Sequence, residues 1–440
     1  MTRPPEARLE PLAVMAGIRT PFAKAFGPLA SVPADELGRV ALTGALDRAG
    51  LKPDQVQEVI FGNVASPPES ANISRVIALR SGVPQDRIAH TVHRNCASGM
   101  EAIIAAWHAI REGRSEIIVA GGTESMSNVP LLWDPRMKDL LLELSRQKSL
   151  VGRLRTMTRF RPGMLKPVPA LQLGLTDPTC GLNMGQTAEL LVKDFGITRQ
   201  EQDEFALQSH QRAVSAWERC FYKGETARVT LGDGTLIDKD SGPRANQTLT
   251  ALAKLKPLFE PSTGSVTAGN SCPITDGACA LVLAPLERAR AMGTAPLGYI
   301  RDYAVAGCEP RRMGLGPVFA SKLLMDRYGM SPSDFDLIEI NEAFAGQVIA
   351  CQRAFASVRF AEEHFGRTSA LGEVPNDKLN VNGGAIALGH PVGTTGARLV
   401  LTLLRALKEK NLNRGLATLC IGGGQGMAMW VERNEEQGES

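Results

Sequence analysis

The stretch HRNCASGMEAIIAAWHAI, residues 93–110, places a cysteine between a short polar segment and a long apolar one. The apolar segment predicts a helix over 96–111, and strand-like apolar runs that end in Gly or Asn stand on either side, at 58–65 and 116–122. A strand, a helix and a second strand in this order predict an α/β architecture. A free cysteine is usually a small buried apolar residue, so Cys96 alone does not indicate a site.

The same order recurs late in the chain. DFDLIEINEAFA (334–345) predicts a strand that runs into a polar turn, GHPVGTTGARLVLTLLRAL (389–407) a helix entered through glycine, and LATLCIGGGQGMAMW (416–430) a strand closed by glycines. In each half a residue with reactive chemistry, Cys96 or His390, stands in the loop before the helix. We interpret this as an internal duplication, with coincidence among common strand–helix patterns as the alternative.

Residues 125–258 differ in character and predict a lobe inserted between the halves. The segment RQKSLVGRLRTMTRFRPGMLKP (146–167) holds seven basic residues and no acidic one, and four apolar residues at helical spacing form a stripe beside the basic face: Leu150, Val151, Leu154 and Met157. A further helix is predicted to start at Thr198, with Glu201 completing a capping box. The predicted domains are 1–124 continued by 259–293, the loop domain 125–258, and the second half 294–440.

Composition indicates an ordinary soluble globular protein: 440 residues are 43% hydrophobic and 22% charged, with a formal net charge of +3. Such a balanced charge favours no nucleic-acid partner. The first residues, MTRPPEARLEPLAV, lack the apolar core of a signal peptide, and the end, EEQGES, carries no peroxisomal signal, so we expect a cytoplasmic protein. Eight cysteines without a CxxC pair, and six histidines, predict reduced thiols and no metal site.

Four stretches taken together carry chemistry: NCASG from Asn95, NEAFA from Asn341, NGGAIALGHPVG from Asn382 and CIGGGQG from Cys420. This combination closely resembles the thiolases, the Claisen-type acyltransferases of 3-oxoacyl-CoA and acetyl-CoA. The resemblance spans nearly the whole chain, through RTPF (19–22), GGTESMS (121–127), LNMGQTAE (182–189), SVTAGN (265–270) and DGA (276–278). It implies an α/β thiolase fold, in which two similar βαβαβαββ halves form five layers, α/β/α/β/α, with an inserted loop domain.

The resemblance also implies a role for each reactive residue. Cys96 would be the acylated nucleophile, with its pKa lowered by the start of a helix. His390 would be the base that activates Cys96, and it would also donate to an oxyanion together with a water held by Asn341. Cys420 would be the second thiol, an acid/base with an ordinary pKa of about 8.5, although a cysteine that simply ends a strand is the alternative. The N–H groups of Gly422 and Cys96 would form a second oxyanion hole.

Coenzyme A, a substrate rather than a cofactor, would lie along the loop domain and the TAGN segment. By resemblance Arg244 lies beside the nucleotide, and the pantetheine is flanked by the apolar residues Met184, Leu252 and Phe344. The chain reads TAGNSC where TAGNAS is commoner, so Cys272 replaces a pantetheine-contacting serine and Ser271 precedes it. For each of these residues, an ordinary core or surface position is the alternative.

The predicted function is thiolytic cleavage of 3-oxoacyl-CoA by CoA in fatty-acid β-oxidation. The long basic insert and NSCPITDGA (270–278) look most like the β-subunit of trifunctional-type fatty-acid oxidation complexes. That likeness implies medium or long acyl chains, a hydratase/dehydrogenase α-subunit and contact of 146–167 with a membrane surface or with that subunit; a homodimer or homotetramer is also expected. The segment 146–167 could instead be a solvated helix that covers the pocket or steers CoA phosphates.

Three other functions remain open. One is a biosynthetic acetoacetyl-CoA thiolase. Another is a condensing enzyme of the β-ketoacyl synthase type, which would not need Cys420. The last is a non-catalytic lipid carrier, although such proteins tend to lose one of the reactive residues, and all four are present here.

Overall fold

The strands of both halves form one continuous ladder in the computed structural model, which describes residues 10–435. The first half contributes β1 (Leu12–Arg19), β2 (Ala23–Lys24), β3 (Glu58–Gly62), β4 (Ile88–Val92), β5 (Ile118–Ser125) and β10 (Thr275–Pro285). The second half contributes β11 (Gly298–Gly307), β12 (Leu337–Ile340), β13 (Arg414–Ile421) and β14 (Gln425–Glu432). The order is β12-β13-β14-β11-β1-β10-β5-β3-β4, with β2 beside β10, and the short antiparallel pairing of β1 with β11 joins the halves.

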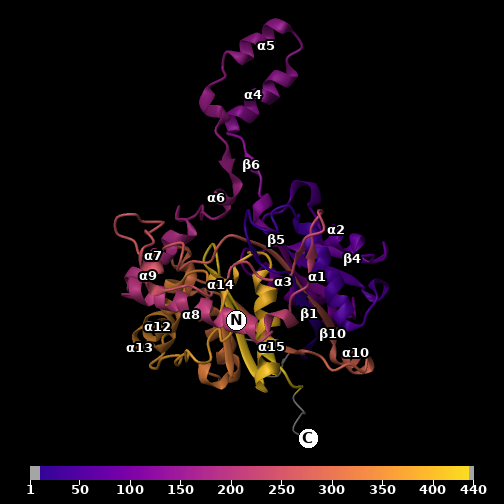
Figure 1. Cartoon of the computed structure of the whole chain (residues 1–440), viewed down its shortest axis with the longest axis vertical. Helices are drawn as coiled ribbons and strands as arrows, with labels where there is room; N and C mark the ends of the chain where they lie inside the picture. Colours follow the sequence, from indigo (N-terminus) through magenta and orange to yellow (C-terminus); the bar gives the residue numbers. More distant parts are fainter. Residues whose placement is uncertain (1–9, 436–440) are drawn as a thin grey trace.

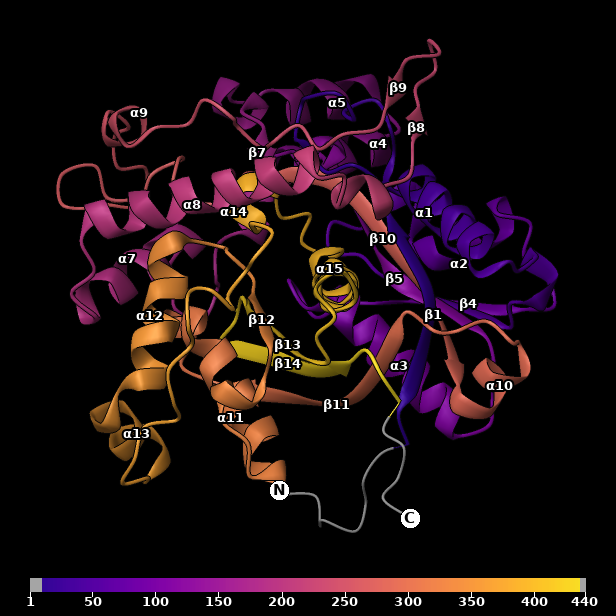
Figure 2. The ribbon, with the colours of Figure 1, turned by 60° about the horizontal axis from the view of Figure 1, so that its bottom comes forward.

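Helices lie in three layers around and between the two half-sheets (Figure 1 and Figure 2). On the outer face of the first half are α1 (Ala34–Ala49) and α2 (Ile73–Arg80), and α11 (Gly316–Tyr328) covers the second half with α12 (Ala345–Ala356) beside it. Between the half-sheets lie α3 (Ser98–Arg111) and α15 (Thr395–Lys410), which pack on each other. The remaining short helices are α10 (Leu286–Ala291), α13 (Val358–Phe365) and α14 (Ala385–Leu388). This arrangement confirms the predicted five-layered thiolase fold.

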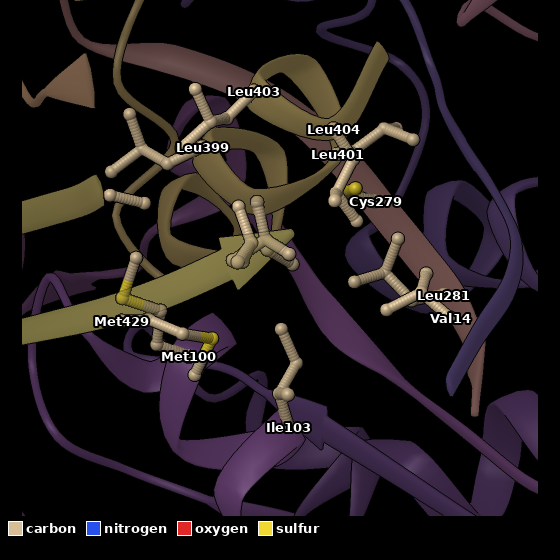
Figure 3. Packing of buried hydrophobic residues seen from close by; sticks show 14 of the residues in the cluster. Val14, Met100, Ile103, Cys279, Leu281, Leu399, Leu401, Leu403, Leu404 and Met429 are labelled. Atoms are coloured by element: carbon tan, nitrogen blue, oxygen red, sulfur yellow. The ribbon is translucent and has the colours of Figure 1, made fainter. Parts of the chain in front are cut away.

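The two central helices can touch because glycine stands where they meet. A Cβ atom on Gly99 would lie 2.7 Å from the backbone nitrogen of Ala397, and one on Gly396 would lie 2.5 Å from that of Met100. Around this contact, side chains from both helices and from β10 and β14 form one buried cluster (Figure 3). Each buried Leu, Ile or Met there contributes about 1.5–3 kcal/mol of hydrophobic stabilisation. The first turns of α3 and α15 are thereby held side by side.

The elements predicted from the sequence are present, with shifted ends. The helix predicted over 96–111 begins at Ser98, because Ala97 takes the N-cap position. The run 416–430 is two antiparallel strands rather than one, because Gly423 and Gly424 adopt φ values of 93° and 81°, which reverse the chain. The expectations about MTRPPEARLEPLAV and EEQGES rest largely on residues 1–9 and 436–440, which lie outside the described part.

Residues 125–258, predicted to form an inserted lobe, contain six α-helices and four short strands. They are β6 (Leu131–Leu132), α4 (Pro135–Arg146), α5 (Leu150–Met157), β7 (Val168–Pro169), α6 (Ala170–Gly174), α7 (Met184–Asp194), α8 (Arg199–Glu218), β8 (Val229–Thr230), β9 (Leu236–Ile237) and α9 (Leu249–Ala253). The predicted capping box is present: the nitrogen of Thr198 donates to the carboxylate of Glu201 at 2.7 Å, and the nitrogen of Glu201 donates to the Thr198 hydroxyl at 3.2 Å. This box starts α8, which packs on α14 and α12.

Residues 131–169, which we call the arm, project away from the rest of the molecule (Figure 1). The antiparallel pair of β6 and β7 forms its base, and α4 and α5 pack on each other beyond it. The predicted apolar stripe on α5 faces solvent, with Leu150 and Val151 74% and 77% exposed. No residue of α5 lines the cavity beside Cys96. No described helix has the length and apolar character needed to cross a membrane.

Candidate active site

Cys96 lies in a tight loop between β4 and α3. The nitrogen of Arg94 donates to the hydroxyl of Ser98 at 2.9 Å, and that hydroxyl donates to the carbonyl of Asn95 at 2.7 Å. Asn95 has φ of 44°, a left-handed conformation that Asn tolerates better than most residues. The loop thus closes on itself and leaves the Cys96 side chain half-buried at the edge of a cavity.

The predicted lowering of the Cys96 pKa is wrong. Burial raises the pKa of the thiol, and the neighbouring backbone N–H groups of Gly422 and of Cys96 itself lower it in part. Because α3 begins only at Ser98, Cys96 stands before the N-cap and lies outside the first turn of the helix.

His390 is held in one orientation by hydroxyl groups. Its backbone nitrogen donates to the hydroxyl of Thr275 at 3.2 Å, and its Nδ1 atom lies 2.6 Å from the hydroxyl of Thr395. The Thr395 hydroxyl has a single proton and also lies 3.0 Å from the carbonyl of Pro391, so the arrangement in which both contacts are hydrogen bonds places the imidazole proton on Nδ1. Nε2 is then an acceptor, and it is buried without a hydrogen-bond partner among the described residues.

Electrostatics keep this imidazole neutral. Burial lowers the pKa of His390 to about 3, and the positive charge of Arg398 adds to the effect. Asn341, directly after β12, is 1% exposed, and neither the Oδ1 nor the Nδ2 atom of its amide has a partner within 10–435. Buried polar atoms are normally paired, so free atoms on His390 and Asn341 indicate a place for a ligand or a water.

Cys420 lies near the end of β13, 1% exposed. Burial raises its pKa well above the ordinary value, and charge on Cys96 or Cys272 would raise it further, which places these thiols near one another. The expected ordinary pKa for Cys420 is therefore wrong, because the strand carries it into the interior. The nitrogen of Asn341 donates to the carbonyl of Thr418 at 3.0 Å, so Asn341 lies beside the same strand.

A cavity of about 600 Å³ opens beside the nucleophile. Cys96, Asn95, Gly422 and Val392 form one side, so loops from both halves meet there. Most of the remaining wall is apolar and comes from the end of β3 and from the loop domain: Val64, Ala65, Met126, Val129, Pro130, Ala170, Leu171, Leu173, Leu175, Pro178 and Met184. The cavity fits a reactive thiol that receives an apolar chain.

The residues expected to contact CoA are only partly gathered at this cavity. Met184 lines it, and a Cβ atom on Gly422 would lie 3.2 Å from the Met184 sulfur. Arg244 is exposed on the loop before α9, whereas Leu252 is fully buried in a small cluster and offers no surface. Phe344 is buried too, at the N-cap of α12.

The TAGNSC segment lies against the residues that follow Asn341. Ser271 bridges to Phe344, and its hydroxyl donates to the carbonyl of Thr267 at 2.7 Å, within its own loop. The nitrogen of Cys272 donates to the carbonyl of Ala343 at 3.1 Å. The Cys272 thiol is half-buried, and burial raises its pKa to about 12. Cys272 thus stays a neutral thiol in the neighbourhood of Cys96.

Sequence reasoning missed Thr395, Glu124 and the side chain of Asn95. Asn95 begins the NCASG motif and Thr395 lies within the quoted stretch 389–407, but a sequence motif does not say which distant or neighbouring atoms these side chains contact. Glu124 stands in GGTESMS. A carboxyl group within an otherwise apolar strand could have indicated a buried residue with a specific role. Among the described residues, no group of three or more His, Cys, Asp or Glu side chains is placed to hold a metal ion.

Two sequence-family models match almost the whole chain. The thiolase N-terminal domain matches residues 12–287, and the thiolase C-terminal domain matches residues 294–433. The chain belongs to the thiolase family. Among curated relatives of this thiolase, the 3-ketoacyl-CoA thiolase of Serratia proteamaculans is 40% identical over 423 residues, 96% of each chain. That of Photobacterium profundum is 39% identical over 425 residues, 96% of this chain and 97% of the relative.

Solved thiolase structures superpose over nearly the full length. The acetyl-CoA acetyltransferase of Bacillus anthracis has a TM-score of 0.84 and 36% identity, covering 97% of this chain and 100% of that one. Human mitochondrial 3-ketoacyl-CoA thiolase in complex with CoA has a TM-score of 0.83 and 33% identity, covering 97% and 98%. The fold of this thiolase is therefore shared along its length with enzymes named for both directions of the reaction.

Proposed function

We propose that the protein cleaves 3-oxoacyl-CoA with CoA to give acetyl-CoA and an acyl-CoA shortened by two carbons. The observations that support the proposal are the buried and unpaired Nε2 of His390 and amide of Asn341, and the thiols of Cys96 and Cys420, which lie near each other. A base, two thiols and oxyanion donors are what a carbon–carbon cleavage through a thioester requires. The names of the relatives agree with this reaction.

In the first half-reaction, Nε2 of His390 takes the proton of Cys96, and the thiolate attacks the C3 carbonyl carbon of the substrate. The oxygen becomes an oxyanion that accepts from the N–H groups of Cys96 and Gly422. The C2–C3 bond then breaks, and its electron pair forms the enolate of acetyl-CoA. His390, now protonated, and a water on Asn341 donate to the enolate oxygen, and Cys420 gives its proton to the enolate carbon.

In the second half-reaction, CoA attacks the acyl group on Cys96. The Cys420 thiolate left by the first step takes the proton of the incoming CoA thiol, which restores Cys420. The tetrahedral intermediate expels the Cys96 thiolate, and His390 returns its proton to that sulfur. All three residues end in the neutral forms in which they began, so the cycle is balanced.

Burial explains why the resting site is uncharged. The same low-dielectric surroundings raise the pKa of both thiols and lower that of His390. A thiolate alone or an imidazolium alone is disfavoured there, whereas the pair formed by one proton transfer from Cys96 to His390 is stabilised by mutual attraction. The site is therefore favoured either with all three groups neutral or with one proton transferred from Cys96 to His390.

The direct test incubates the purified protein with 3-oxooctanoyl-CoA and CoA and follows acetyl-CoA and hexanoyl-CoA by mass spectrometry. The wild type should form both products in equal amounts, and Cys96→Ala should form neither. A wild-type protein that needs malonyl-CoA and only condenses would be a β-ketoacyl synthase. One that binds acyl-CoA without turnover would be a carrier.

The apolar cavity favours a β-oxidation enzyme acting on medium or long chains over a biosynthetic acetoacetyl-CoA thiolase. An acetyl group on Cys96 is too small to fill about 600 Å³ of largely apolar space. A longer acyl chain would fill it, and each buried methylene would contribute about 0.8 kcal/mol to binding. Rates on 3-oxoacyl-CoA substrates of four to sixteen carbons should therefore give kcat/KM values that rise with length and then level. A maximum at four carbons would favour the biosynthetic alternative.

For the arm, the proposed partner is an anionic membrane surface. Residues 131–169 hold nine basic and three acidic residues, against a net charge of +3 for the whole chain. Large apolar side chains are exposed on the same hairpin, among them Leu141, Leu142, Leu150, Val151 and Leu154. Apolar side chains that insert, beside cations that meet acidic headgroups, are the features of an interfacial segment.

Sedimentation with vesicles tests the arm. The protein should sediment with vesicles containing phosphatidylglycerol, and binding should weaken at high salt and in the double variant Leu150→Ser, Val151→Ser. The matched control is Val358→Ser, an exposed valine on α13 outside the arm. Equal binding by wild type and double variant would exclude the arm as the membrane contact.

We further propose a cytoplasmic homo-oligomer that works with a hydratase/dehydrogenase α-subunit, since such a subunit would supply 3-oxoacyl-CoA. The support for self-association is β4, which ends the ladder with its outer edge unpaired and with Ile88 50% exposed. Light scattering on the purified protein should give the mass of a dimer or tetramer. Co-expression with the candidate α-subunit should shift the protein to a larger complex, and no shift would exclude a stable one.

A further inference from the structure

The side chain of Asn95 forms a hydrogen bond between the two halves of the molecule, next to Cys96. The Nδ2 atom of Asn95 donates to the carbonyl oxygen of Gly422 at 2.8 Å, across 327 positions of sequence. Asn95 immediately precedes Cys96, and Gly422 begins the turn between β13 and β14. The residue before the nucleophile therefore contacts the loop that follows the second thiol.

The turn that Asn95 contacts has little to hold it in place. Its residues Gly422, Gly423 and Gly424 have no side chains, and the last two adopt left-handed φ values. At the first position the turn also packs closely on the side chain of Met184, since a Cβ atom on Gly422 would lie 3.2 Å from the Met184 sulfur. Glycine has more conformational freedom than any other residue, so a turn of three needs contacts from outside.

Outside contacts are present at both ends of the turn. At its far end the carbonyl of Gly424 accepts from the nitrogen of Cys308 at 2.7 Å, and the side chain of Gln425 accepts from Arg94 at 3.2 Å. At its near end, the amide of Asn95 binds Gly422. The left-handed φ of Asn95 turns its side chain toward the second half while Cys96 faces the cavity.

Gly422 matters because it lines the same cavity as Cys96, and its N–H lies close enough to the sulfur to lower the pKa of the thiol. We propose that Asn95 is a positioning residue, whose amide holds Gly422 so that this N–H stays directed at the sulfur and at the oxyanion formed next to it. The bond is made by a neutral amide, which adds no charge beside the thiol. Asn95 thus joins the nucleophile loop of one half to an oxyanion donor of the other.

Two substitutions separate this role from simple support of the loop. Asn95→Gly accepts the same left-handed φ but removes the amide, so the nucleophile loop can keep its shape while Gly422 is released. Asn95→Asp keeps the shape of the side chain but replaces the donor by a carboxylate, which faces a carbonyl oxygen and brings negative charge toward the thiol. Both should impair Cys96, and Asp more than Gly.

The experiment measures the reactivity of Cys96 without substrate, by iodoacetamide alkylation at a series of pH values, with the modified cysteine identified by mass spectrometry. Asn95→Gly should shift the pH profile of Cys96 alkylation upward and lower kcat/KM for thiolysis about 10- to 100-fold through kcat, with KM little changed. Asn95→Asp should shift the profile further. Circular dichroism and thermal melts establish that each variant is folded.

The matched control is Gln425→Ala, which removes the bond from Arg94 to the same turn but leaves the amide of Asn95 on Gly422. It should lower the melting temperature slightly and leave the alkylation profile of Cys96 unchanged. A folded Asn95→Gly protein with the wild-type profile would overturn the proposal, as would a Gln425→Ala protein shifted equally. Only the expected change in kcat rests on the proposed function. The alkylation profile of Cys96 tests the role of Asn95 even if the protein catalyses no thiolysis.

Discussion

The Nδ1 atom of His390 and the hydroxyl of Thr395 lie 2.6 Å apart, on the loop before α15 and in its first turn. Because the same hydroxyl donates to the carbonyl of Pro391, the pair settles which nitrogen of His390 is free. Free Nε2 is required if His390 is to take the proton of Cys96. A residue outside the thiolase motifs thus determines whether the proposed base can act.

Replacing Thr395 by Val keeps the shape of the side chain and removes the acceptor for Nδ1–H. The imidazole can then change tautomer or rotate, and we expect kcat to fall about 10- to 100-fold with KM nearly unchanged, a part of what a general base contributes. Thr395→Ser retains the hydroxyl and should keep most of the activity. Steady-state kinetics with 3-oxooctanoyl-CoA measures kcat and KM for both variants. Equal rates for the Val and Ser variants would show that the Thr395 hydroxyl does not orient His390.

Cys420→Ala should separate acyl transfer between thiols, which exchanges carbon–sulfur bonds, from cleavage of the carbon–carbon bond. Exchange of labelled CoA into acetyl-CoA breaks only carbon–sulfur bonds, so Cys96 and His390 suffice for it. Thiolysis also needs a proton donor for the enolate carbon, which we assign to Cys420. Cleavage should therefore fall about 100-fold or more while exchange changes little. If both reactions fell equally, Cys420 would not be specific to the carbon–carbon step.

The fold could be predicted because each helix and strand of its repeated unit is indicated by residues close together in the sequence. The helix near Cys96 follows a short polar segment and the helix near His390 follows a glycine-containing one, and each stands between apolar runs that form strands. Thr198 and Glu201 likewise define a helix start within four residues. Such patterns need no knowledge of distant contacts.

The electrostatics and the shape of the site could not be predicted in this way. The pKa values of Cys96 and Cys420 rise because residues remote in sequence exclude water from them, and no local pattern records that burial. The contact of Asn95 with Gly422 joins loops 327 positions apart. The cavity wall combines Val64, which follows β3, with Leu171 of α6.

Glu124 should make the stability of the protein depend on pH. Its fully buried carboxylate accepts from the side chain of Asn63 and from the backbone nitrogens of Val64, Ala65 and Gly393, at 2.9–3.1 Å. Burial nevertheless raises its pKa from 4.5 to about 7. The folded state thus binds the proton more tightly than the unfolded state, so the free energy of unfolding falls as pH rises from about 4.5 to about 7.

Glu124→Gln removes this titration. Between pH 5 and pH 8 the variant should lose less of its free energy of unfolding than the wild type, by up to about 3 kcal/mol. Urea unfolding of both proteins at the two pH values measures the change in the free energy of unfolding. Subtracting the change in the variant from that in the wild type cancels the contributions of other buried acids such as Glu339, whose pKa is raised to about 8. Parallel pH dependence in the two proteins would mean that Glu124 stays ionised throughout.

Leu171→Trp tests whether the cavity beside Cys96 holds the acyl chain. Leu171, in α6, lines the cavity, and a larger side chain would fill part of its volume of about 600 Å³. We expect kcat/KM for 3-oxohexadecanoyl-CoA to fall at least tenfold while that for acetoacetyl-CoA changes less than threefold, because a short chain does not reach the added ring. The matched control is Leu154→Trp, an exposed leucine of the arm outside the cavity. An equal loss for both substrates, or the same loss in the control, would place the acyl chain elsewhere.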